Sequence, residues 1–413
     1  KGIGEKMIKF LERKMKKMNL LIIFFADRRL GLASFGGPIA HIGFFRDEYV
    51  GRRKWISDRS FSELVALSQL LPGPASSQLG IAIGTLKGGR IGGFLAWLGF
   101  TTPSAIVLIA FAYGMTEIEM FKNSSWLHGL KLVVVPVVGF AVWGMASSIW
   151  IDRKRQLIGV LAAVAVLFAP GVLSQLVLIF MGALAGMLFL RKQSLEQVNS
   201  DAIFSRSPSK RSALVALVIF ILGLVFLPVL YRITGSQQID LFENFYRTGS
   251  LVFGGGHVVL PLLHSETVGS GYVNNDQFIA GYGISQAIPG PLFTFASFLG
   301  ASAQGTFDQR WVGGLVTLVA IFVPSFLLVW SVLPFWSTLS RNYRVYGAVN
   351  GVNVVVVGVL LSALYDPIWN TSVSNGRDFA IVAALFGMLA FLKLPPWIVV
   401  ISGVLAGWAT GLI

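Results

Sequence analysis

Repeated apolar runs of about twenty residues constrain this chain more than any other feature. A helix needs about 20 apolar residues to cross the hydrocarbon core of a bilayer. Only 13% of the 413 residues are charged, against about 25% in soluble proteins, so charge cannot cover a soluble surface. We therefore expect an all-α polytopic membrane protein. The clear runs are 91–113, 127–150, 156–170, 172–190, 212–233, 312–335, 346–365, 379–393 and 396–413.

Four further apolar stretches are interrupted near their middles by glycine and proline. Proline removes a helical N–H group and clashes with the preceding turn, and glycine adds backbone freedom. We expect each stretch to be two half-helices that meet inside the membrane, and whether 20–50 and 60–87 span or re-enter is left open. The stretches are 20–50, 60–87, 240–265 and 277–303, broken at Gly36-Gly37-Pro38, Pro72-Gly73-Pro74, Gly254-Gly255-Gly256 and Pro289-Gly290-Pro291.

The two halves of the chain repeat each other. Residues 35–51 match 253–269, SQLLPGP at 68–74 recurs as SQAIPGP at 285–291, 92–104 recurs as 313–325, and GALAG at 182–186 recurs as GVLAG at 403–407. The helix at 212–233 has no counterpart, and one extra crossing would place the second repeat upside down. The predicted units are an amphipathic helix (1–19), a first repeat (20–190), a linker (191–211), an extra helix and loop (212–239) and a second, inverted repeat (240–413).

The net charge of +14 lies entirely in one half. Residues 1–211 contain 26 basic and 12 acidic side chains, and residues 212–413 contain 7 of each. Loops rich in Lys and Arg stay on the cytoplasmic side, so the charge indicates orientation rather than a nucleic-acid partner. We expect an inner-membrane protein with a cytoplasmic N-terminus, whose first helix lies on anionic lipids. A cytoplasmic linker at 191–211 fits this orientation.

The breaks predict a site for an oxyanion. Inverted repeats with broken helices are typical of transporters that bind substrate at the midplane. A half-helix that starts at a break presents free N–H groups and a partial positive charge. The alternative is that the breaks only shape helix packing. The candidate substrate-binding residues surround the breaks: Gly36, Gly37, Pro38, His41, Arg46, Gln69, Gly73, Pro74, Ser76, Ser77, Gln78, Gly254, Gly255, Gly256, His257, Gln286, Gly290, Pro291 and Thr294.

Four basic residues are candidates for contacting the anion. Arg46 lies in FFRDE, and Arg29 and Arg247 occupy equivalent repeat positions. A guanidinium binds a tetrahedral oxyanion through two parallel hydrogen bonds. Alternatively these side chains, and Lys131 near a helix start, extend to the lipid headgroups.

Acidic residues and histidines supply the remaining candidates. Glu48 and Glu266 are repeat equivalents, and Glu63 lies in a broken helix. Each could carry a coupling proton or pair with a base. His41 and His257 lie near the glycine breaks, where either could titrate, donate to an anion or be structural.

Several kinds of chemistry are excluded. The chain has no cysteine and four histidines, which rules out disulfides and thiolate sites and makes a histidine-built metal centre unexpected. The SFGG and VFGGG segments lack the lysine of a phosphate-binding loop. We expect no cofactor, no metal and no enzymatic activity. A membrane enzyme or scaffold remains the alternative of another class.

With these motifs the sequence resembles the chromate ion transporter (CHR) family, in its long two-domain form. The resemblance rests on SFGGPIAH at 34–41, FRDEYV at 45–50, LLPGP at 70–74, GLKLVVVPVVG at 129–139, and FGGGHVVLP and SQAIPGP in the second half. It implies a bacterial-type inner-membrane protein that exports chromate and confers chromate resistance. Gly256 stands where the first half has Pro38, so which half-site binds is left open.

Chromate is a tetrahedral dianion, which agrees with a site of helix dipoles and arginines. Each charge crossing the membrane is worth about 2.3 kcal/mol per 100 mV, so two charges leaving a negative interior gain roughly 4.6 kcal/mol. Export then needs no nucleotide. The runner-up is a transporter for sulfate or a related oxyanion, inward and coupled to protons or other cations. The coupling ion, the direction of transport and a monomeric or homodimeric state are left open.

Overall fold

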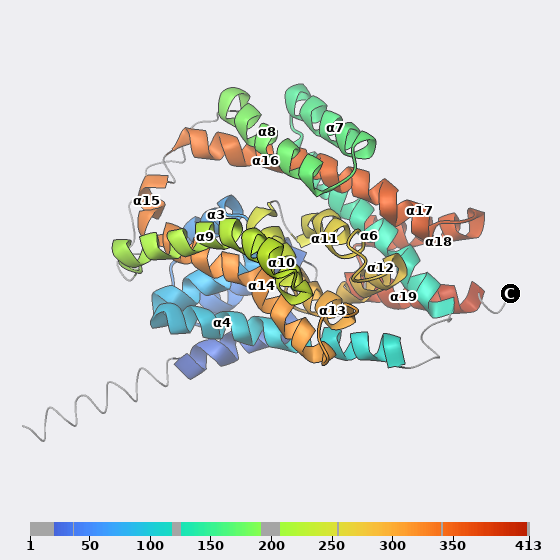
Figure 1. Ribbon diagram of the computed structural model, residues 1–413, viewed down its shortest axis with the longest axis horizontal. Helices are drawn as coiled ribbons and strands as arrows, with labels where there is room; N and C mark the ends of the chain where they lie inside the picture. The colour runs from blue at the N-terminus through green and yellow to red at the C-terminus, as the bar shows by residue number, and fades with distance from the viewer. Residues whose placement is uncertain are drawn as a thin grey trace, which may run out of the picture.

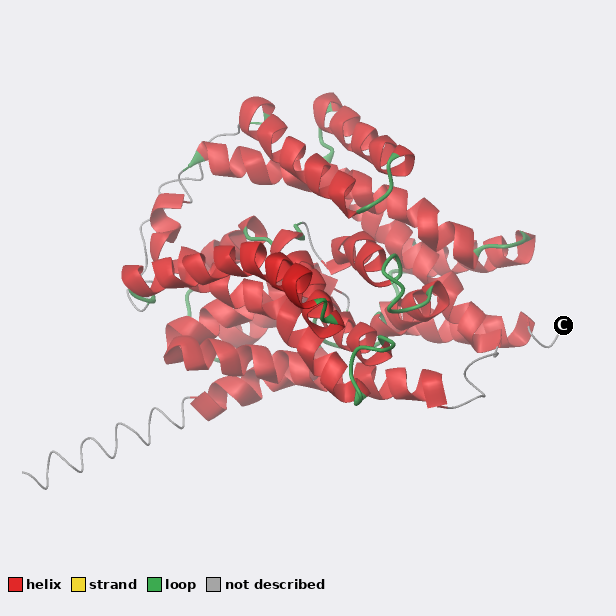
Figure 2. Cartoon of the chain, viewed as in Figure 1, coloured by secondary structure: helices red, strands yellow, loops and turns green. Residues whose placement is uncertain are grey.

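The computed structural model describes residues 20–35, 37–117, 125–190, 207–253, 256–339 and 342–410. Throughout these ranges the chain forms helices and loops without a strand (Figure 2). Five of the described helices are long and apolar enough to cross a membrane: Ala75–Met115, Ser125–Ile149, Lys210–Thr234, Arg310–Leu339 and Tyr343–Ser372. The predicted all-α polytopic membrane fold is confirmed. The helix predicted at 1–19, residues 191–206 of the linker, and Gly36, Gly254 and Gly255 lie outside the described residues.

The first half begins with a helix over 20–33, and its later helices start at side-chain caps. Ser57 caps α3 by accepting from the Ser60 N–H at 3.1 Å, and Asp152 caps α7 by accepting from the Arg155 N–H at 2.9 Å. The elements that follow the first helix are α2 (Gly37–Arg46), η1 (Asp47–Arg52), α3 (Asp58–Leu70), α4 (Ala75–Glu117), α6 (Ser125–Ile149), α7 (Arg153–Phe168) and α8 (Val172–Phe189).

Helix α9 (Lys210–Thr234) lies between the halves, and the second-half elements follow it. Both halves contain a first helix interrupted at a glycine segment, a helix that ends before a Pro-Gly-Pro turn, and a long helix, α4 or α14. The orientation of the repeats remains a prediction. The second-half elements are α10 (Gln237–Leu251), η3 (Gly256–Val258), α11 (Val259–Thr267), α12 (Asn275–Ser285), η4 (Leu292–Thr294), α13 (Phe295–Ser302), α14 (Arg310–Val332), η5 (Leu333–Phe335), α15 (Trp336–Leu339), α16 (Tyr343–Ala363), η6 (Leu364–Trp369), α17 (Asn370–Ser372), α18 (Gly376–Ala390) and α19 (Pro396–Thr410).

Helix α4 joins two segments that the sequence separates. The predicted half-helix ending near residue 87 and the predicted membrane run from residue 91 form one kinked helix, bent at Gly88 and Gly89. Gly89 has φ +68°, which favours glycine, so the backbone turns without a loop. A Cβ built on Gly84 would lie 2.6 Å from the carbonyl oxygen of Gly92, so the two arms of α4 cross in close contact.

Helices of one half pack on helices of the other through glycine. Helix α6 packs on α18 and α19, and α16 packs on α7 and α8; α7, α8 and α16 lie together at the top of Figure 1. A Cβ on Gly129 of α6 would lie 2.1 Å from the Gly403 oxygen, and one on Gly347 of α16 would lie 2.7 Å from the Gly186 oxygen. Small residues let membrane helices approach closely. The two halves therefore pack together at two helix pairs, α6 with α19 and α16 with α8.

Candidate functional site

Each Pro-Gly-Pro turn packs against the broken first helix of the opposite half. The Gly73 N–H donates to the Val252 carbonyl at 2.6 Å, and the Gly290 N–H donates to the Ser34 carbonyl at 3.0 Å. Val252 and Ser34 are equivalent residues, each directly before the phenylalanine that opens a glycine segment. The sequence predicted both kinds of break but not this pairing between halves.

A serine from the opposite long helix completes each contact. A Cβ built on Gly73 would lie 2.7 Å from Ser325 Oγ, and one on Gly290 would lie 2.7 Å from Ser104 Oγ. Gly73 and Gly290 have φ values of +114° and +116°, so glycine is needed for both its backbone and its size. We call these contacts the first junction (Gly73, Val252 and Ser325) and the second junction (Gly290, Ser34 and Ser104).

The first junction contains buried polar atoms that lack partners. Gln78 Nε2 donates to the Pro72 carbonyl and lies 3.3 Å from Ser325 Oγ. Gln78 Oε1, Ser77 Oγ and Thr248 Oγ1 are buried and have no hydrogen-bond partner among the described residues. Burying a polar group without a hydrogen bond is costly. These atoms are therefore candidates for binding a ligand or water.

The second junction also has buried polar atoms nearby, and these belong to the first half of the chain. Ser34 Oγ, Thr101 Oγ1 and His41 Nδ1 are buried without a partner in the described part of the chain. The His41 ring contacts Phe100, the neighbour of Thr101, edge-on at 5.6 Å. Thr294 differs, since its hydroxyl donates to the Pro291 carbonyl at 2.6 Å. The free acceptors and donors here come from the first half.

The start of α4 supplies N–H groups at the first junction. Pro74 immediately precedes the helix, and Ser76, Ser77 and Gln78 form its buried first turn. The first N–H groups of a helix have no partner within it, and the helix dipole adds partial positive charge there. Together with the serine hydroxyls, these groups favour an anion.

Comparison with known proteins identifies the class of molecule that carries this site. The family model described as chromate transporter matches residues 20–187 and 239–408, and so covers both halves. The chain belongs to the chromate transporter family. The chromate transport protein of Pseudomonas aeruginosa is 28% identical over 389 residues, covering 92% of this chain and 90% of that protein. The chromate transport protein of Cupriavidus metallidurans is 24% identical over 396 residues, covering 94% and 92%.

A shorter relative fits the duplicated layout. The uncharacterized transporter YwrA of Bacillus subtilis is 33% identical over 143 residues, which is 35% of this chain but 77% of YwrA. No solved structure matches the chain. Family membership and the apolar helices together make this a multi-pass membrane protein.

Three of the four predicted basic candidates, Arg46, Lys131 and Arg247, bind carboxylates. Arg46 Nε and Nη2 donate to Asp58 at 2.7 and 3.0 Å, and both side chains are more than half exposed (56% and 57%). The Arg46 guanidinium holds the pKa of Asp58 below its usual value. Arg29 is exposed, and Lys131 Nζ lies 2.9 Å from Asp276 Oδ1.

Other predicted candidates divide between local contacts and exposure. Gln69 is exposed. Gln286 Nε2 donates to the neighbouring Ser285 Oγ at 3.3 Å, and His257 Nδ1 lies 2.6 Å from the Tyr282 hydroxyl. None of the contacts described for Gln69, Gln286 and His257 joins them to either junction.

The predicted acidic candidates of the first half pair with arginines. Glu48 is buried and accepts from Arg52 and from Arg53, the latter at 2.6 Å. Glu63 lies 3.7 Å from Arg59. Both first-half carboxylates therefore lie beside arginines of their own segments.

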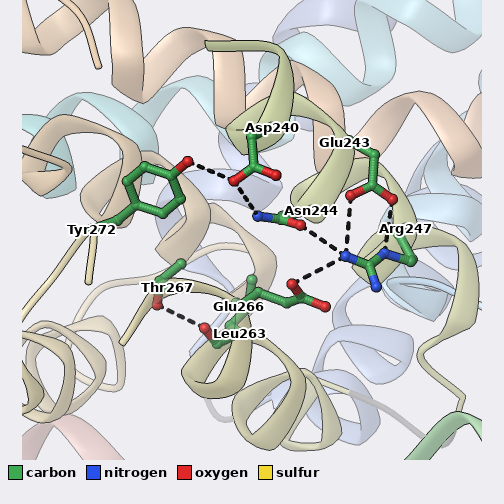
Figure 3. A network of polar contacts seen from close by, with 8 residues as sticks. All are labelled: Asp240, Glu243, Asn244, Arg247, Leu263, Glu266, Thr267 and Tyr272. Carbon is green, nitrogen blue, oxygen red and sulfur yellow. Dashed lines mark hydrogen bonds and ion pairs between the residues drawn. The ribbon is translucent and has the colours of Figure 1, made fainter. Parts of the chain in front are cut away.

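Glu266 lies in a larger network around Arg247 (Figure 3). Arg247 Nη2 lies 3.1 Å from Glu266 Oε2, and Arg247 Nε lies 2.8 Å from Glu243 Oε1. Asp240 accepts from Tyr272 at 2.5 Å. One guanidinium therefore pairs with two carboxylates, Glu243 and Glu266. Burial raises the pKa of Glu266 to about 7, although Arg247 opposes the rise.

Sequence reasoning missed three residues. Ser104 and Ser325 each follow a proline at the end of a repeated segment, and that shared ending was the available signal. Asp27 is 1% exposed, and its Oδ2 has no partner in the described ranges. Its signal was an acidic residue within an apolar run, directly before Arg28 and Arg29.

Proposed function

We propose that this transporter exports chromate across the inner membrane and binds it at the two junctions. Family membership and relatives named chromate transport proteins support chromate as the substrate. The observation that carries the site is the first junction: a helix start, buried Ser77 and Gln78 atoms without partners, and Ser325 from the opposite half. No Asp or Glu lies within three residues of any break.

Neutral donors suit a doubly charged oxyanion in this setting. The N–H groups at the start of α4 and the hydroxyls of Ser77 and Ser325 can each donate to one of four equivalent oxygens. They supply positive potential without burying full positive charges, which would be expensive in the membrane. Cations would meet the positive end of the helix and be rejected. Sulfate has the same shape and charge and is the natural competitor.

The way the junctions are assembled supports alternating access. Each junction takes its Pro-Gly-Pro turn from one half and its acceptor carbonyl and serine from the other. A movement of one half against the other therefore changes both junctions together. In transporters with inverted repeats, such rocking exposes a central site to each side in turn. We propose that opening one junction accompanies closing the other.

Membrane potential alone provides enough energy for export. With about 2.3 kcal/mol per charge per 100 mV, two negative charges leaving a negative interior gain roughly 4.6 kcal/mol. The excess of Lys and Arg in the first-half loops supports a cytoplasmic N-terminus. Export would then carry the anion away from the side of the membrane on which the N-terminus lies.

Purified transporter in liposomes tests the proposal. Radiolabelled chromate should accumulate on the positive side of an imposed potential, and unlabelled sulfate should compete. Gly73→Ala should reduce this transport, with Gly171→Ala as the matched control. If sulfate is transported and chromate is not, the substrate is sulfate and the proposal for chromate is wrong. Transport of neither anion at any potential would refute it.

A further inference from the structure

Asp27 is a buried carboxyl with one oxygen bound and one oxygen unbound. It lies on the helix over 20–33, and its side chain is 1% exposed. The Tyr49 hydroxyl of η1 donates to Oδ1, while Oδ2 has no partner within the described parts of the chain. A carboxyl removed from water binds a proton more readily than one in water. Oδ2 is the free position for that proton.

Both arms of α4 contact Asp27. A Cβ built on Gly80 would lie 3.4 Å from Asp27 Oδ1, and one on Gly99 would lie 3.2 Å from Asp27 Cβ. Gly80 belongs to the arm that starts at the first junction, and Gly99 belongs to the arm that carries Ser104 of the second junction. The charge of Asp27 therefore acts on the helix that links the two proposed anion sites.

Among the described residues Asp27 forms no ion pair, and Arg53, whose charge acts on it, binds Glu48. On its own helix, Arg28 and Arg29 are exposed. On η1, Glu48 is occupied by Arg52 and Arg53. The other groups around it are accounted for as follows: Asp47 is exposed, Arg46 binds Asp58, His41 is buried against Phe100, and Arg53 and Lys87 lie over the Trp55 ring at 5.0 and 5.6 Å.

The second half does not duplicate this group. At the offset of 218 residues, the position of Asp27 is taken by Phe245, which is fully buried, and that of Tyr49 by Thr267. The Thr267 hydroxyl donates to the Leu263 carbonyl at 2.7 Å (Figure 3). The Asp27–Tyr49 pair is therefore specific to the first half.

We propose that Asp27 is a proton-binding site that couples anion transport to the pH difference across the membrane. The inference rests on the proposed function. Asp27 takes a proton on Oδ2 when accessible from one side and releases it on the other. Its charge changes from −1 to 0, while Tyr49 keeps its own proton and its hydrogen bond. The change acts on both arms of α4 and so on both junctions.

Liposomes with the membrane potential clamped at zero test this site. Internal and external pH both stay alkaline, so that the labelled chromate is fully deprotonated on each side. With one coupled proton, the wild type should shift its final anion ratio about tenfold per pH unit of gradient. Asp27→Asn should still equilibrate the anion but lose the shift. Asp47→Asn removes an exposed carboxylate nearby and should behave as the wild type.

The outcomes separate the two proposals. A full shift in Asp27→Asn, or no shift in a wild type that transports, would overturn the role of Asp27 alone. If the wild type fails to transport chromate at every membrane potential tested, the proposed function is refuted instead. Should Asp27→Asn not fold, Tyr49→Phe keeps the carboxyl and removes its donor. It should move the pH midpoint of the transport rate upward, and an unchanged midpoint would contradict the proposal.

Discussion

Adding one methyl group at Gly73 should damage the proposed site in two ways. At φ +114°, a residue other than glycine costs about 1–3 kcal/mol of backbone strain. The new Cβ would also lie 2.6 Å from Gln78 Nε2 and 2.7 Å from Ser325 Oγ, so both side chains must shift. Losing one hydrogen bond to the anion costs about 1–2 kcal/mol, which corresponds to roughly tenfold weaker binding. Gly290→Ala should act similarly, because its Cβ would meet Ser104 Oγ at 2.7 Å.

Gly171→Ala is the matched control for backbone strain. Gly171 has φ +136°, and nothing lies within 4 Å of its Cβ position. All three variants should lose thermal stability by comparable amounts. Chromate uptake into everted vesicles should show a roughly tenfold higher KM only for Gly73→Ala and Gly290→Ala. The reasoning fails if Gly73→Ala transports like the wild type, or if Gly171→Ala raises KM equally.

Three further predictions follow from contacts away from the junctions. The exchange Arg46→Asp with Asp58→Arg should keep transport near the wild-type rate, because the pair joins α2 to α3; loss of transport in a folded double variant would make Arg46 an anion ligand. Gly129→Leu should lower the melting temperature far more than Gly43→Leu. A Cβ on Gly129 would lie 2.1 Å from the Gly403 oxygen, whereas nothing lies within 4 Å of the Gly43 Cβ position. Equal effects would contradict the close packing of α6 on α19 at Gly129. Since the pKa of Glu266 is raised from 4.5 to about 7, its contribution to stability is present at low pH and is lost as pH rises through that interval. Thermal unfolding of Glu266→Gln should lack this loss, and an unchanged pH profile would count against it.

The breaks were predictable because their signals are local. Proline and glycine in immediate succession disrupt a helix strongly, so Pro72-Gly73-Pro74 and its second-half equivalent identify half-helix ends without knowledge of the fold. A single proline is tolerated, as Pro103 is within α4. Apolar length likewise identified the membrane helices. The kink at Gly89 was harder, because a glycine pair fits both a loop and a bend.

The pairing across the halves was not predictable from local signals. That Gly73 bonds to Val252, rather than to its own half, depends on packing between segments far apart in the sequence. Arg46 was a candidate ligand because its partner Asp58 lies beyond the helical spacing at which an ion pair is recognised. Asp27 was missed since its burial depends on Tyr49 and on both arms of α4.

Chromate accumulation against an imposed membrane potential tests the central claim most directly. In liposomes containing the purified transporter, labelled chromate should concentrate on the positive side. In Asp27→Asn, where two charges should move without a coupled proton, the ratio should approach roughly 2,000-fold at 100 mV, following from about 4.6 kcal/mol. It should fall to one when the potential is abolished at equal pH. Chromate that equilibrates equally on both sides at every potential, or does not enter at all, would contradict potential-driven export.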